Sequence, residues 1–523
     1  MHNILTAELI HFKTDDNSVV EASLPDVYAA LVRDEIASFP VLRPHQRHAW
    51  HAFLVQLGAI AMHKAGIGEP PEDACEWRRI IRAVTQDFPD DEPWHLVVDD
   101  ITKTAFMQPP ASSEDKTADY KNTVATPDEL DMLVTSKNHD LKASVASSAS
   151  IDDWIFALVS LQTTEGFLGA GNYGVSRMNG GLGCRPAFSL APSARHGIHA
   201  RRDILALLKH RDRLLDDHDP FLADAGTDLL WLKEWDGTRA ETIITGLDPF
   251  YIEICRRIRL MFTVDKQLFA IRATSKAARI NSRSLKGITG DPWTPINPKE
   301  SKSLTLSAAG FRYRRTAEYL STEWNQPVLF EPLDSEKGTM TLIARGMVRG
   351  QGKTEGYHER TVELRPKAVG AFGRGRGLDE LGEISRERIE DIRLLHRILR
   401  HAIAVFAAGG DTEGVSDEHR DRANVWVDMH DDIVDRGFFG DLQDEFESDD
   451  AARRRQVRNE WRRGLVDEAR TILQQAEDTL PCPAIQRYRA RVRAESIFEA
   501  RIKGNNGFPE LYTSEENDDD RGN

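Results

Sequence analysis

The segment HQRHAWH carries three histidines, His45, His48 and His51, whose spacing is suited to metal binding. Residues three apart share one face of a helix, so His45 and His48 could act as a pair, while His51 would point away from them. No glutamate follows His45 in the pattern H-E-x-x-H, which would supply a general base. We expect packing or interface histidines, with a metal-dependent hydrolase using all three as the alternative.

Other catalytic signatures are absent from the sequence. It contains no G-x-x-x-x-G-K-[ST] phosphate loop, no G-x-S-x-G nucleophile turn and no G-x-G-x-x-G that joins a strand to a helix. The four cysteines are far apart and form no C-x-x-C pair, which argues against a disulfide framework or a zinc ribbon. They are Cys75, Cys184, Cys255 and Cys482. The sequence predicts a protein that is not an enzyme and needs no cofactor.

Three segments instead carry residues suited to nucleic acid. The first, DMLVTSKNHDLKASVASSAS at 131–150, holds small and hydrogen-bonding side chains that can order around splayed bases and phosphates. A plain surface loop is the alternative. The candidate RNA-binding residues in this segment are Ser136, Lys137, Asn138, His139 and Lys142.

The second segment, EGFLGAGNYGVSRMNGGLGCRP at 165–186, contains seven glycines in 22 residues. Glycine lets the backbone approach a ligand where a Cβ would collide, and Tyr173 and Arg177 offer stacking and groove hydrogen bonds. Tight structural turns are the alternative. The candidate DNA-binding residues here are Gly169, Gly171, Asn172, Gly174 and Asn179.

The third group consists of two short loops. In DPWTPINPKESK, a backbone stiffened by proline presents Lys299 and Lys302. In GMVRGQGKTEGYHERTVELRPK, an apparent hairpin places Gln351, Gly352 and Lys353 at a tip that could enter a duplex. An ordinary exposed hairpin and a lysine-bearing loop explain the same residues locally.

Composition and charge describe a soluble globular protein with an uneven charge distribution. The net charge of -16 argues against non-specific nucleic-acid binding, yet nine basic residues and one acid, Asp265, lie between Cys255 and Lys286. That stretch could hold a phosphate backbone or form a solvated basic face. No apolar run approaches the 18 residues of a membrane span, and the N-terminal segment lacks the features of a signal peptide, so we expect a cytoplasmic protein.

Hydrophobic periodicity predicts an α+β fold: an irregular mixed N-terminal domain followed by an all-α four-helix bundle. Helices are expected at Leu24 to Val32 and in the run that begins at His45, among β-like runs such as AFSLAP and TLIARGMV. Four amphipathic stretches follow Arg376. The predicted organisation is an N-terminal domain at 1–375, a hinge at 376–382, the bundle at 383–510 and an acidic disordered tail at 511–523.

Long phrases of the sequence resemble the CasA family, the large subunit of the type I-E CRISPR surveillance complex Cascade. The phrases LVTSKNHDLK and GAGNYGVSRMNGG are the most particular, and SLPDVYAALVRDEIASFPVLRPHQRHAWHAFLVQL, AFMQPP, DPFYIEICRRIRL and DPWTPI extend the similarity over most of the chain. Some relatives carry clustered cysteines near the position of Cys255, which stands alone here, so no metal is implied.

The resemblance implies a non-catalytic subunit that acts in antiviral defence. Such a subunit contacts the 5′ handle of the CRISPR RNA (crRNA), reads the protospacer-adjacent motif (PAM) of double-stranded target DNA from the minor groove, starts the strand separation that forms an R-loop, and helps recruit a helicase-nuclease. Its other partners are the backbone, handle-binding and small subunits of Cascade, and no membrane is involved. By resemblance, Ser136 to Lys142 form the handle loop, Lys299 or Lys302 the lysine finger, and Gln351 to Lys353 the strand-separating wedge. A scaffold that binds only proteins is a further alternative.

Overall fold

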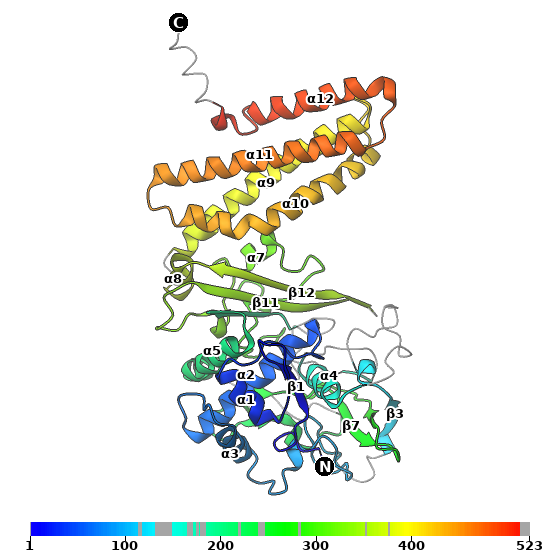
Figure 1. Ribbon diagram of the computed structural model, residues 1–523, viewed down its shortest axis with the longest axis vertical. Helices are drawn as coiled ribbons and strands as arrows, with labels where there is room; N and C mark the ends of the chain where they lie inside the picture. Colours follow the sequence, from blue (N-terminus) through cyan, green and yellow to red (C-terminus); the bar gives the residue numbers. More distant parts are fainter. Residues whose placement is uncertain are drawn as a thin grey trace. The chain divides into compact units, whose positions relative to one another are not determined.

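The computed structural model divides the chain into two compact units. One comprises Met1–Phe311 with Glu323–Val362, and the other comprises Arg312–Thr322 with Glu363–Asn523. The residues that the structure describes are 2–112, 118–130, 149–164, 171–173, 177, 185–217, 221–238, 246–280, 284–350, 353–374 and 377–512. Figure 1 shows the sheets in the first part of the chain and the long helices in its last part. This arrangement confirms the predicted α+β class.

Helices build the core of the first unit. They are α1 (Leu24–Val32), α2 (Arg47–Ala65), α3 (Ala74–Val84), α4 (Ile151–Thr164), α5 (His196–Lys209) and α6 (Arg211–Asp217). A capping box starts α1, in which the Asp26 carboxylate accepts from the Ser23 backbone N–H at 3.0 Å. Helix α2 ends at Gly66, which has φ +66°. Every residue of α2 from His48 to Met62 is buried, because α3, α4 and α5 pack around it.

Small sheets surround these helices. The strands are β1 (Ile10–Lys13), β2 (Val19–Ala22), β3 (Tyr120–Val124), β4 (Ala187–Ala191), β5 (Thr227–Leu229), β6 (Leu247–Ile252), β7 (Arg257–Phe262), β8 (Leu268–Ala273), β9 (Ile296–Asn297), β10 (Lys302–Ser303), β11 (Met340–Gly350) and β12 (Lys353–Leu364). Two of the sheets have three strands, in the orders β12-β11-β4 and β3-β8-β7. The predicted strands AFSLAP and TLIARGMV are confirmed as β4 and β11, which pair antiparallel.

The second unit is helical. Its helices are α7 (Tyr313–Tyr319), α8 (Pro366–Arg374), α9 (Leu378–Ala407), α10 (Asp417–Phe446), α11 (Ala451–Thr479) and α12 (Ala484–Lys503). Helix α9 is the first of the predicted amphipathic stretches. It packs against α10, α11 and α12 through an apolar face on which Ile392, Leu395 and Leu399 are fully buried. Residues 378–382, which the sequence assigned to a hinge, form the start of α9. Residues 513–523 of the predicted tail lie outside the described residues.

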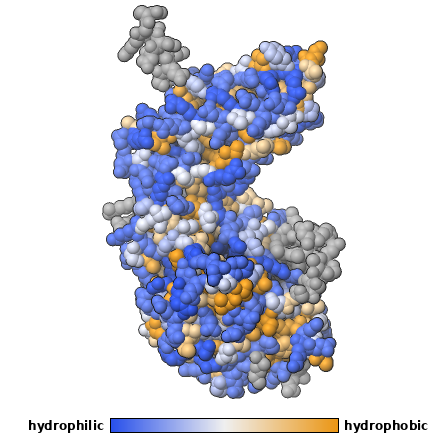
Figure 2. All heavy atoms as spheres, in the orientation of Figure 1, coloured by the Kyte–Doolittle hydropathy of each residue, from blue (hydrophilic) through white to orange (hydrophobic). Residues whose placement is uncertain are grey.

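The surface of the second unit is largely hydrophilic on the face drawn in Figure 2, with hydrophobic side chains showing at the end where α11 and α12 join. Ile485, near the start of α12, is 93% exposed. Across the part of the chain that the structure describes, none of the helices combines the length and the apolar character needed to cross a bilayer.

Candidate nucleic-acid interface

The glycine segment is held at Gly171 by the loop that follows β8. Its carbonyl accepts from the backbone N–H of Ser275 at 2.8 Å, and its φ of +85° belongs to the left-handed region that glycine favours. A Cβ at this position would lie 2.9 Å from Cγ2 of Thr274. The local backbone therefore requires glycine at position 171. At this one position the structure supports the alternative of a tight structural turn. Asn172 is half-buried beside it, and the Tyr173 side chain is exposed.

Two buried arginines anchor the same segment farther along. Arg177 pairs through Nε with Glu253 at 3.3 Å, and its guanidinium lies 3.6 Å from the centre of the Tyr251 ring. Arg185 pairs with Asp291 at 2.6 Å and reaches Glu253 at 3.9 Å. Both arginine side chains are fully buried. The prediction that Arg177 contacts a DNA groove is wrong, because its donors are used inside the protein.

The lysine loop is the turn of a hairpin formed by β9 and β10, in which Lys302 lies opposite Asn297. The Lys299 side chain is 71% exposed and its Nζ is 3.2 Å from Glu323, while Lys302 is 41% exposed and pairs with Glu300. Surface pairs of this kind contribute about 0 to 1 kcal/mol and exchange readily for another anion. Both lysines are presented to solvent, as the prolines of the segment predict.

The base of this hairpin interlocks with the glycine segment. Arg177 donates to the carbonyl of Gly290 at 3.3 Å, and the Thr294 hydroxyl donates to the carbonyl of Pro186 at 2.7 Å. Together with the pair of Arg185 and Asp291, these contacts join Arg177, Arg185 and Pro186 to residues 290–294. The start of the lysine hairpin and the end of the glycine segment are thus fixed to each other by side chains that are 3% exposed or less.

The hairpin of β11 and β12 extends past the start of β4, where the glycine segment ends. Arg345 of β11 lies opposite Ala187 at the start of β4, and the two strands are antiparallel. Gly346–Gly350 therefore run past the start of β4, where a Cβ on Gly346 would be 3.5 Å from Cα of Pro186. These residues carry β11 about 17 Å farther before the link to β12. Lys353 begins β12, and Gln351 and Gly352 lie outside the described residues.

The remaining predicted residues of these loops also lie outside the described residues. They are Ser136, Lys137, Asn138, His139 and Lys142 of the handle loop and Gly169, Gly174 and Asn179 of the glycine segment. Their assigned contacts stay predictions.

The basic stretch from Cys255 to Lys286 divides between core and surface. Arg259 donates to the backbone carbonyls of Val98, Lys103 and Gln108, and burial lowers its pKa to about 10, so it stays charged at neutral pH. Three further arginines are also buried; they are Arg256, Arg257 and Arg279. Lys266, Arg272, Lys276 and Lys286 are exposed. Half of the described cations in this stretch are therefore structural.

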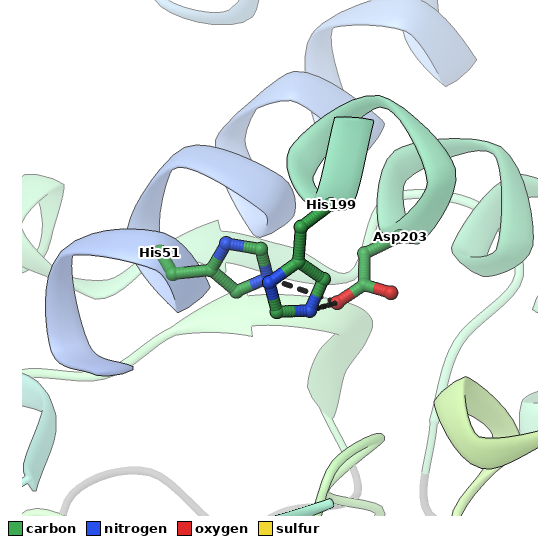
Figure 3. A group of neighbouring side chains, drawn as sticks. All are labelled: His51, His199 and Asp203. Carbon is green, nitrogen blue, oxygen red and sulfur yellow. Dashed lines mark hydrogen bonds and ion pairs between the residues drawn. The ribbon is translucent and has the colours of Figure 1, made fainter. Parts of the chain in front are cut away.

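The three histidines of HQRHAWH do not form one cluster. Instead His51 joins His199 and Asp203 of α5, and this is the one group of possible metal ligands found among the described residues (Figure 3). His48 is buried against Trp293, with 5.7 Å between ring centres, and burial holds its pKa well below the usual value. The sequence reasoning missed His199 and Asp203, although their spacing of four residues on a helix was a signal for a shared face.

Comparison with solved structures gives long matches at low sequence identity. Cse1 of Acidimicrobium ferrooxidans aligns with a TM-score of 0.63 and 15% identity, covering 95% of this chain and 97% of that one. CasA (Cse1) of Thermus thermophilus aligns with a TM-score of 0.62 and 16% identity, covering 95% of this chain and 98% of that one. Cse1 of Thermobifida fusca aligns with a TM-score of 0.61 and 17% identity, covering 96% of this chain and 97% of that one. No family model matches the sequence, and no curated protein is significantly similar to it in sequence. The resemblance noted from the motifs is confirmed in the fold, which this chain shares along nearly its whole length with the CRISPR-associated CasA (Cse1) proteins.

Proposed function

We propose that this chain is the large subunit of a type I-E CRISPR surveillance complex and reads the motif that flanks a DNA target. The shared fold of the CRISPR-associated Cse1 proteins supports the first part. One arrangement carries the second part: the end of the glycine segment, the base of the lysine hairpin and the β11–β12 hairpin lie at one end of one sheet. Buried side chains join two of the three loops that the sequence assigned to a single task, and the third extends from the same end of the sheet.

The chemistry of the lysine hairpin suits the minor groove. The ammonium groups of Lys299 and Lys302 can donate to the adenine, thymine and cytosine acceptors and to phosphates, since only weak surface pairs compete for them. The minor groove distinguishes mainly A·T from G·C, so we expect several motifs to be tolerated. Guide pairing then supplies the remaining specificity, and Gln351 to Lys353 wedge between the strands as the R-loop starts.

The remaining partners follow from the same proposal. Ser136 to Lys142 bind the 5′ handle of the crRNA, the other subunits of the complex hold this chain in place, and a helicase-nuclease is recruited afterwards in the cytoplasm. We propose no catalytic role for this chain. The hydrolase alternative, which uses His45, His48 and His51, is not favoured. These three side chains are buried, at 8%, 4% and 7% exposure, and they form no group of metal ligands among the described residues.

Co-expression with a guide RNA and the other subunits of a type I-E complex tests this proposal. We expect the full chain to co-purify with the RNA and to stay bound on dilution. Alanine at Lys137, Asn138 and His139 together should loosen that retention, while alanine at Lys103 and Lys209, two surface lysines paired with Glu92 and Asp334, should not. A chain that never associates with the RNA complex would contradict the proposal, and one that associates but confers no DNA binding would be a protein-only scaffold.

A further inference from the structure

A buried cluster of two imidazoles and one carboxylate joins α2 to α5. Nε2 of His51 is 2.9 Å from Oδ2 of Asp203, and Nε2 of His199 is 3.1 Å from the same oxygen. The two rings are stacked, with 3.8 Å between their centres (Figure 3). His199 and Asp203 are four residues apart on one face of α5, and His51 faces them from α2. The three ligand atoms thus all lie within 4.8 Å of one another in the core.

Ser189 of β4 completes the surroundings of His199. Nε2 of His199 is 2.7 Å from the hydroxyl oxygen of Ser189 and 3.1 Å from Oδ2 of Asp203. With a hydrogen on this nitrogen, the two oxygens share it as a bifurcated hydrogen bond. With a lone pair on this nitrogen, His199 can instead bind an ion that Asp203 also ligates.

Burial and an outer contact favour an ion at this cluster. The side chains of His51, His199 and Asp203 are buried, at 8%, 3% and 0% exposure, so bulk water does not compete for the ligand atoms. The other oxygen of Asp203 is 3.3 Å from Arg202, which orients the carboxylate as outer groups orient metal ligands.

The distances also agree with a metal site. Zinc bonds to imidazole nitrogen and carboxylate oxygen at about 2.0 to 2.2 Å, which places neighbouring ligand atoms about 3 to 3.5 Å apart. We propose that His51, His199 and Asp203 bind one divalent transition metal, for which zinc is the probe, and that the hydroxyl of Ser189 lies beside the fourth position. The ion would tie α2 and α5 to β4 inside the first unit. Its role is structural, since no substrate reaches the site.

Metal analysis of the purified full-length chain tests this site. After dialysis against buffer with trace zinc, we expect about one zinc per chain, and removal by a chelator should lower the melting temperature reversibly. The variants His51→Ala and His199→Asn should each contain at least about tenfold less zinc. His11→Ala is the matched control, because His11 pairs with the buried Asp152 at 2.9 Å without a second imidazole, and it should keep the metal.

A measurement on the wild-type chain keeps the test valid if the variants do not fold. Cobalt(II) in a site of two nitrogens and oxygen gives ligand-field absorption in the visible, which we expect to appear on loading and to disappear when zinc is added. The proposal would be overturned if the wild-type protein contained no zinc, gave no cobalt spectrum and had the same melting temperature with and without either ion. Equal zinc content in the wild type and in folded His51→Ala would overturn it as well.

Discussion

The buried arginines around the glycine segment and the exposed lysines of the β9–β10 hairpin carry the same charge and have opposite uses. Arg177 and Arg185 have no exposed side-chain surface; Arg177 pairs with Glu253 and backbone carbonyls, and Arg185 pairs with Asp291. Lys299 is 71% exposed and pairs with the surface carboxylate of Glu323. The planar guanidinium, with five donors, can be fully paired in a core, whereas an ammonium on a flexible stem stays in water. Basic residues therefore locate a phosphate-binding surface only after the buried ones are set apart.

The largest expected effect is the loss of a buried anchor. Arg185→Met leaves Asp291 without its 2.6 Å partner inside the protein, so the free energy of unfolding should fall by about 3 to 5 kcal/mol. Urea unfolding of the purified chain measures this change. Arg79→Met is the control, because Arg79 is 62% exposed and pairs with Glu76 on the surface of α3. Equal stabilities of the two variants would erase the distinction between buried and exposed cations.

Gly171→Ala should have the next largest effect on stability. The new Cβ would meet Thr274 at 2.9 Å, and the backbone would keep a φ of +85°, so we expect a loss of about 1 to 3 kcal/mol. Gly66→Ala separates the two causes, since Gly66 has φ +66° and open space around its missing Cβ. A smaller loss for Gly66→Ala in the same unfolding assay is expected. If Gly171→Ala lowered the free energy of unfolding by no more than Gly66→Ala does, the close approach to Thr274 would not contribute to the loss.

Buried polar groups also connect the helices of the second unit, through a series of hydrogen bonds. Arg314 donates to Nδ1 of His396 at 3.3 Å, His396 lies 2.9 Å from Nδ1 of His430, and His430 lies 3.2 Å from the carbonyl of Leu465. Burial, with His430 and Arg314 nearby, lowers the pKa of His396 to about 3.

This shift predicts an acid-sensitive helical unit. Between about pH 6.5 and 3 the unfolded chain binds a proton at His396 that the folded chain does not, so stability should decrease as pH falls, by up to about 1.4 kcal/mol per pH unit. His396→Gln should show a shallower slope in unfolding curves recorded across that range. Identical slopes would mean that His396 is not held neutral.

The smallest expected effect belongs to the exposed lysines. Alanine at both Lys299 and Lys302 removes only surface pairs with Glu323 and Glu300, so the free energy of unfolding should change by about 0.5 kcal/mol or less. A thermal melt of the double variant beside the wild type measures it. A loss as large as that of Arg185→Met would show that the hairpin belongs to the core rather than to a binding surface.

Sequence patterns predicted the local features of the fold well. The helix at Leu24 to Val32, the apolar spacing in α2 and α9, and the presentation of Lys299 by its prolines all depend on residues close together in the chain. The anchors could not be predicted in this way. Arg177 pairs with Glu253 across 76 positions and Arg185 with Asp291 across 106, and one sequence contains no signal for such pairing. For the same reason His51 was grouped with its neighbours His45 and His48 instead of with His199 and Asp203.

The central claim is that the lysine hairpin reads duplex DNA, and target binding by the assembled complex tests it most directly. The measurement compares Lys299→Ala/Lys302→Ala with wild type on two guide-matched targets, a duplex with randomised flanking base pairs and the single strand alone, with Lys103→Ala/Lys209→Ala as the charge-matched control. We predict binding to the duplex weakened about 5- to 150-fold and binding to the single strand nearly unchanged, because guide pairing no longer depends on motif capture. Equal losses on both targets, or no loss on either, would contradict the account.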